Sequence, residues 1–151
     1  MGEQYVSAQA RLGNLPEIRA ELFPRIFDDS PLGKLIYRLE DPADRGSFRL
    51  LRANASAART AHPRIFSHVG KTLNETSPYL LNTEIPDYYT AAARHGEFRQ
   101  WVITTDTRAL AEKTYEAHCA PLGDGYVVVA FQDISERTRM QQEVSRHVAE
   151  L

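Results

Sequence analysis

The residues best suited to chemistry in this chain are its histidines and its single cysteine. Cys119 directly follows His118, and an imidazole beside a thiol is a pairing that can activate a nucleophile. The surrounding pattern predicts a strand over residues 113–121, and neighbours in a strand point to opposite faces of the sheet. We therefore expect no joint action of the two side chains, with Cys119 on the apolar face as a small core residue.

The other histidines do not form a metal-binding pattern. His62 and His68 are six residues apart with a proline between them, which is poor spacing for two ligands on one helix. His95 and His147, like His62, are expected at solvated positions. The sequence therefore predicts no metal site.

Phosphate-binding and acid–base motifs are also missing. Gly70-Lys71-Thr72 lacks the upstream glycine and the preceding strand of a phosphate-binding loop. Asp28 and Asp29 are interpreted as surface charges at the end of a helix. The chain is accordingly predicted to have no catalytic residues and not to be an enzyme.

Composition predicts one soluble globular domain. Hydrophobic residues make up 42% and charged residues 25% of the 151 residues, which is ordinary for such a domain. The net charge is −2, from 18 basic and 20 acidic residues, so we expect no nucleic-acid partner. One cysteine excludes an internal disulfide and suits the cytoplasm. No apolar run approaches the ~20 residues that span a bilayer, and no signal peptide is recognisable.

Hydrophobic patterning predicts an α+β fold. Five strands are expected at residues 33–39, 47–53, 98–104, 113–121 and 126–132. The segment between the second and third strands is helical, with short helices at 54–60 and 63–69 and a main helix from near Pro86 to the stop at Gly96. This order predicts an antiparallel sheet with helices gathered on one face.

Turn residues define one strand connection and leave another open. Leu122-Gly-Asp-Gly125 predicts a tight hairpin between the last two strands. The link over residues 106–112 is longer, so the sequence does not specify the register of the third and fourth strands.

Helices are also predicted at both ends of the chain. In the first, from Pro16 to about Asp29, an apolar stripe comprises Ile18, Leu22, Ile26 and Phe27, and Pro24 is a possible kink. We expect the sheet or a second copy of the chain to cover this stripe. In the last, over residues 136–151, Met140, Val144, Val148 and Leu151 have helical spacing.

The fifth strand and the last helix meet at Asp133-Ile134-Ser135. Asp133 is predicted to cap the helix, and Glu136, three residues on, to complete a capping box. A rigid strand would thereby be joined to an amphipathic helix by a defined connector.

These features resemble a PAS domain. Four stretches match. The family's opening resembles Phe27-Asp-Asp-Ser-Pro-Leu-Gly33, and its second strand with the following Asn-Pro-Ala-Ala turn resembles Phe48-Arg-Leu-Leu-Arg-Ala-Asn54-Ala55, with alanine for proline. The glycine that opens the family's short helices resembles the start of Gly70-Lys-Thr-Leu, and the family's Asp-Ile-Thr-Glu-Arg ending resembles Asp133-Ile-Ser-Glu-Arg137. The resemblance covers roughly residues 27 to 136. It implies a five-stranded PAS core at 30–133, an N-terminal helical cap at 1–29 and a C-terminal linker helix at 134–151.

The resemblance also implies a ligand site between the sheet and the main helix. Its candidate lining residues are Tyr37, Tyr88, Tyr89, Trp101, Cys119 and Val129. The alternative is that these side chains simply fill the core, as aromatic residues do in any domain. A ligand, if bound, would be small and mostly apolar.

No cofactor is expected. The flavin photosensors of the LOV class carry a reactive cysteine at the position of Leu73, and haem-binding members carry an axial histidine at a position that matches one near Ile85. Neither residue type is present at its position.

The resemblance implies a sensor and dimerisation module of a bacterial signalling protein. Such a module would relay a small-ligand or partner signal through Asp133, Ile134 and Ser135 to a C-terminal effector domain, such as a histidine kinase or a diguanylate cyclase. The candidate dimer contacts are Ile18, Leu22 and Ile26. The alternatives are a ligand-free protein-interaction module and a small α+β enzyme that uses His118 or a tyrosine as its acid or base.

Overall fold

The structure, a computed structural model, describes residues 22, 24–60, 62–105 and 112–150. Its centre is a five-stranded antiparallel sheet in the order β2-β1-β5-β4-β3. The strands are β1 (Gly33–Leu39), β2 (Phe48–Ala53), β3 (Arg99–Thr105), β4 (Lys113–Gly123) and β5 (Tyr126–Asp133). The predicted α+β class and strand number are confirmed.

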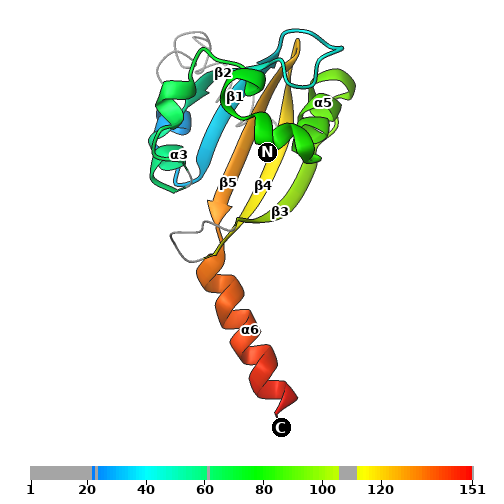
Figure 1. Ribbon diagram of the computed structural model, residues 1–151. Helices are drawn as coiled ribbons and strands as arrows, with labels where there is room; N and C mark the ends of the chain where they lie inside the picture. The colour runs from blue at the N-terminus through cyan, green and yellow to red at the C-terminus, as the bar shows by residue number, and fades with distance from the viewer. Residues whose placement is uncertain (1–21, 23, 61, 106–111, 151) are drawn as a thin grey trace, which may run out of the picture.

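The helical segment between β2 and β3 covers one face of the sheet (Figure 1). It comprises α3 (Ala55–Thr60), the 3₁₀ helix η1 (Ile65–His68), α4 (Leu73–Thr76), the 3₁₀ helix η2 (Pro78–Asn82) and the main helix α5 (Ile85–His95). The sequence did not predict α4 and η2 as separate elements. Local signals mark where each of them begins. The Glu75 side chain accepts a hydrogen bond at 3.3 Å from the N–H of Thr72, the N-cap of α4, and Pro78 is the first residue of η2.

Positive φ angles mark the two connections that the sequence identified best. Gly96 ends α5 with φ of 66°, and the β4–β5 turn has Asp124 at 54° and Gly125 at 82°. Two successive positive φ angles are the geometry of a two-residue hairpin that matches the strand twist. The β3–β4 pairing, whose register the sequence left open, runs from Arg99 opposite Cys119 to Thr105 opposite Lys113.

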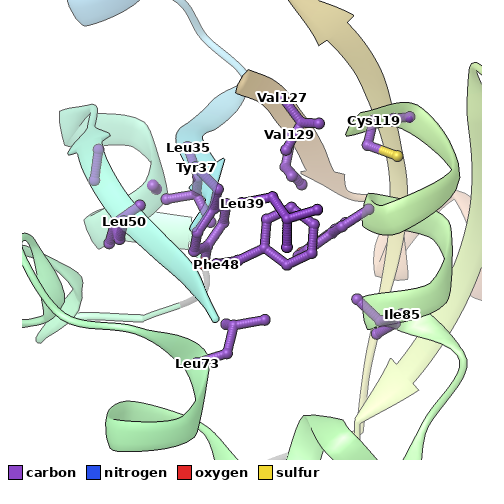
Figure 2. Packing of buried hydrophobic residues seen from close by; sticks show 14 of the residues in the cluster. Leu35, Tyr37, Leu39, Phe48, Leu50, Leu73, Ile85, Cys119, Val127 and Val129 are labelled. Atoms are coloured by element: carbon purple, nitrogen blue, oxygen red, sulfur yellow. The ribbon is translucent and has the colours of Figure 1, made fainter. Parts of the chain in front are cut away.

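The core lies between the sheet and the helices (Figure 2). Residues that alternate along the strands point into this core, and Leu50, Val127 and Val129 are buried there. The Phe131 ring lies across Gly33, where an added Cβ would come within 2.5 Å of a ring carbon. A side chain at Gly33 would therefore displace this ring.

Asn54 joins the segments around the start of α3. Its side-chain oxygen accepts hydrogen bonds from the N–H groups of Lys34 and Ala57, both at 2.9 Å. Its amide donates to the carbonyls of Phe27 and Leu32 at 2.8 and 2.9 Å. All four bonds form although Asn54 is buried, so this residue fixes β1 and the preceding chain against α3.

The last helix, α6 (Ser135–Ala149), leaves the end of β5 and projects away from the sheet (Figure 1). Before β1, residues 24–28 are helical, as predicted, but most of the proposed N-terminal helix lies outside the described residues. In the part of the chain that is described, no helix is both long enough and apolar enough to cross a membrane.

Candidate functional site

The predicted pocket residues gather around an aromatic cluster between the sheet and α5. The rings of Tyr37 and Tyr89 stack with centroids 5.4 Å apart, and the ring of Phe48 meets Tyr89 edge-on at 5.6 Å. Trp101 lies 5.1 Å from Tyr88 and 6.1 Å from Tyr89 between ring centroids. Tyr37, Tyr89, Cys119 and Val129 are buried, whereas Tyr88 and Trp101 lie at the edge of the cluster.

Burial sets the ionisation of the polar groups in this cluster. Removal from water raises the pKa of Tyr37 and of Tyr89, so both hydroxyls stay neutral. Burial also raises the pKa of the Cys119 thiol to about 11, against the opposing effect of Arg99. The thiol donates a hydrogen bond to the Tyr88 carbonyl at 3.4 Å and is protonated at neutral pH, which removes its nucleophilic form.

His118 lies on the opposite face of β4 from Cys119. Its ring meets that of Phe98 with centroids 5.6 Å apart, on the side of the sheet away from α5. The imidazole and the buried thiol therefore do not form a nucleophile and base pair.

The junction between β5 and α6 is attached to β4. The N–H of Ile134 donates to the Thr114 carbonyl at 2.8 Å, and the N–H of Thr114 donates to the Ser135 hydroxyl at 2.8 Å. Within the first turn of α6, Arg137 forms an ion pair with Glu116 of β4 at 3.0 Å. The start of the helix is thus bonded directly to this strand.

The predicted capping arrangement at this junction is wrong in two respects. Ile134, not Asp133, occupies the N-cap position of α6, and no capping box with Glu136 forms. The Asp133 carboxylate still accepts a hydrogen bond at 2.9 Å from the N–H of Ser135, the first residue of the helix. It also accepts a hydrogen bond from the Ser135 hydroxyl. The one-residue shift arises because Ile134 pairs with Thr114 as a continuation of the sheet.

The Asp133 carboxylate is held in its charged form. Burial acts to raise its pKa, but the hydrogen bonds from the hydroxyl and N–H of Ser135 act in the other direction. Lys113 and Arg139 add to this, and the net effect lowers the pKa of Asp133.

Sequence reasoning missed the β4 side of the junction. Thr114, Glu116 and Arg137 contribute to the connection, yet Thr114 is 21 residues from Ser135 in the chain. Thr114 takes part through its backbone N–H and carbonyl, so no side-chain pattern in the sequence could have identified it.

A groove of about 950 Å³ runs along α6 where the helix leaves the sheet. Its lining includes Ile134, Met140 and Val144. Met140 and Val144 are 61% and 64% exposed, as is Val148 at 64%, so an apolar stripe extends along the helix. Such a stripe is typical of a surface that meets a partner.

The N-terminal dimer candidates are only partly described. Ile18 lies outside the described residues, whereas Leu22 and Ile26 are 45% and 64% exposed. Phe27, the fourth member of that stripe, is buried in the domain itself.

The two positions considered for cofactor chemistry hold buried aliphatic side chains. Leu73 opens α4 and Ile85 opens α5, and both belong to the hydrophobic core. Across the described ranges, no group of three or more His, Cys, Asp or Glu side chains is placed to hold a metal ion.

An antiparallel five-stranded sheet with one helical face and a helix continuing from the last strand defines an α+β fold. Residues 46–139 match the sequence profile described as the PAS fold. Since this match spans more than half of the chain, the protein belongs to the PAS family. PAS domains are typically sensory modules rather than catalysts.

Solved structures give the same fold at low sequence identity. An RNA-binding light-oxygen-voltage receptor has a TM-score of 0.62 and 16% identity, over 89% of this chain and 38% of that one. A PAS domain from Colwellia psychrerythraea has a TM-score of 0.52 and 13% identity, over 78% of this chain and 98% of that one. The photoactive yellow protein domain of a sensor histidine kinase from Rhodospirillum centenum has a TM-score of 0.54 and 16% identity, over 70% of this chain and 94% of that one. These likenesses establish the fold alone, and no curated protein sequence shows significant similarity.

Proposed function

We propose that this PAS domain is a homodimeric relay module of a bacterial signalling protein. It would convert a shift of the sheet into a movement of α6 and so control an effector domain that follows in the same polypeptide. The observation that carries the proposal is the junction, where Ile134 and Ser135 bond to Thr114 while the rest of α6 keeps an exposed apolar stripe.

The relay works through shared partners. A displacement of β4 moves Thr114, and the two hydrogen bonds to Ile134 and Ser135 transmit that displacement to the first turn of α6. Asp133, bonded to the same hydroxyl, links the end of β5 to the same point. The effector would be a domain such as a histidine kinase or a diguanylate cyclase, and the module would act in the cytoplasm.

The proposed dimer brings the α6 stripes of two copies together in parallel. Met140, Val144 and Val148 span fewer than two heptads, which is short for a coiled coil on its own. Exposed Leu22 and Ile26 would extend the interface, together with Ile18.

Sedimentation of the purified chain tests the dimer. The wild type should sediment as a dimer, and Val144→Asp should shift it to a monomer, because a charge would enter the apolar contact. Gln142→Asp is the matched control, since it adds the same charge to an exposed position outside the groove. A wild type that stays monomeric at tens of micromolar, or equal effects of both variants, would contradict the proposed interface.

The signal in this proposal is a small, mostly apolar ligand or a partner protein. A ligand would sit at the cluster of Tyr37, Tyr89 and Trp101, with neutral hydroxyl and indole groups as donors. The proposal includes neither a LOV-type flavin nor a haem, because Leu73 and Ile85 supply no reactive or ligating atom. Native mass spectrometry of freshly purified protein should show an added small mass on the dimer.

A ligand-free interaction module is the second candidate. The contact between the rings of Tyr37, Phe48 and Tyr89 favours it, because these side chains then occupy the space themselves. A dimer of unmodified mass, with no thermal shift across a metabolite panel, would select this candidate over the ligand sensor. An enzymatic role has the least support, since His118 and the thiol lie on opposite faces.

A further inference from the structure

Two histidine side chains meet beyond the end of α3. The imidazole rings of His62 and His68 have centroids 4.6 Å apart and planes inclined by 66°. Two residues that are six apart on one continuous helix would not come so close. The contact arises because α3 ends at Thr60 and η1 begins at Ile65. His62 lies in the turn between them, and this turn brings His68 of η1 back toward it.

The backbone around the pair is well anchored. The N–H of His62 donates to the Ala57 carbonyl at 3.2 Å, and its carbonyl accepts the N–H of Ile65 at 2.9 Å. Ile65 itself is buried in the hydrophobic core, which ties η1 to the sheet. The two imidazoles are therefore placed by structured segments on both sides.

One ring nitrogen of this pair lacks a partner. Nδ1 of His62 is buried and accepts or donates no hydrogen bond within the described residues. Buried polar atoms are almost always paired, so this unpartnered imidazole nitrogen is available to an added ligand. An imidazole nitrogen in this state is a common ligand for metal ions.

The ring separation also fits two imidazoles on one ion. Metal–nitrogen bonds of about 2.0–2.1 Å put each ring centre about 3 Å from the metal, so two ligands side by side have centres about 4.5–5 Å apart. The separation of 4.6 Å between His62 and His68 falls in this range.

We propose that His62 and His68 form a binding site for a divalent transition-metal ion of the copper or zinc class. Imidazole nitrogen suits these ions, and copper binds such ligands most tightly. The described residues add no third ligand of the His, Cys, Asp or Glu type, so water or an external group completes the coordination. Binding joins the turn after α3 to η1 and raises the stability of the domain as metal concentration rises.

Copper titration of the tag-free chain tests the site. CuCl₂ at pH 7.5 should bind one ion per chain, with an electron paramagnetic resonance spectrum that shows coupling to two imidazole nitrogens, and ZnCl₂ should raise the melting temperature. His62→Gln and His68→Gln should each weaken copper binding roughly tenfold or more. His95→Gln and His147→Gln remove histidines elsewhere and should leave it unchanged.

Two results would overturn the proposal. The first is a wild-type spectrum with a single coupled nitrogen, which does not depend on whether any variant folds. The second is unchanged copper affinity in the double variant His62→Gln/His68→Gln when its circular dichroism matches that of the wild type.

Discussion

The backbone N–H of Thr114 donates a hydrogen bond to the hydroxyl of Ser135 at 2.8 Å, which ties the first residue of α6 to the beginning of β4. The same hydroxyl donates a hydrogen bond to the Asp133 carboxylate at the end of β5. Two neighbouring strands and the exit helix thus meet at one side-chain oxygen.

Replacing Ser135 should weaken this meeting point. Ser135→Ala leaves the partly buried N–H of Thr114 without an acceptor, and we expect a loss of about 1–3 kcal/mol in the free energy of unfolding. Urea denaturation measures the loss. Ser135→Thr keeps the hydroxyl and is the control; equal stability of the alanine variant and the wild type would show that this bond adds nothing.

Removing the Asp133 carboxylate should loosen the first turn of α6. Asp133→Ala is expected to cost about 1 kcal/mol, as for the loss of a helix cap. The N–H of Ser135 should also exchange faster with deuterium, because it donates to this carboxylate. In a protein that includes the effector, the same variant should uncouple input from output; wild-type signalling would refute the proposed relay.

The Asp133 carboxylate also predicts a pH dependence. Because its folded-state pKa is lowered, it contributes stability at pH values above its unfolded pKa of about 3.9, and this contribution is lost as the pH falls through the folded pKa. Wild type and Asp133→Asn should therefore differ in stability at pH 7 and converge in acid. Thermal melts from pH 7 down to pH 3 measure the difference, and a constant gap across this range would contradict the assignment.

Asn54 should be among the most sensitive polar positions. Asn54→Ala removes an acceptor from two N–H groups and a donor from two carbonyls in a buried setting, and we expect a loss of about 2 kcal/mol or more. Asn54→Asp preserves the acceptor for Lys34 and Ala57 but loses both donated bonds. Chemical denaturation of the two variants separates these contributions, and a neutral alanine variant would show that water replaces the whole network.

Neighbouring leucines of β2 provide a matched test of the core. Leu50 is 1% exposed and Leu51 is 40% exposed. Leu50→Ala should cost about 2–5 kcal/mol, whereas Leu51→Ala should stay within about 0.5 kcal/mol of the wild type. Urea denaturation distinguishes them. A large loss at Leu51 instead would place a partner over that side of the sheet.

Much of the fold was predictable because its signals are local. Residues 33–39 were expected as a strand and form β1 with the same bounds, since their inward residues alternate along the chain. The turn at Asp124-Gly125 and the stop at Gly96 were equally clear, because few residues adopt positive φ angles at low cost.

The candidate sites were less predictable because their partners are distant in the chain. Asp133 and Ser135 were identified from the junction itself, but Thr114 and Glu116 join them only through the pairing of β4 with β5. His62 and His68 looked poorly spaced on a continuous helix. Their contact depends on where α3 ends.

The sequence by itself determined the class of fold, the strand positions to within two residues and the position where the sheet passes into the exit helix, because periodicity, turn residues and caps act within a few positions along the chain. Tertiary structure alone decided that the aromatic residues pack ring against ring, that α6 is bonded to β4 and that two histidines touch. These contacts depend on sheet register and chain reversal, which bring together residues that share no local pattern.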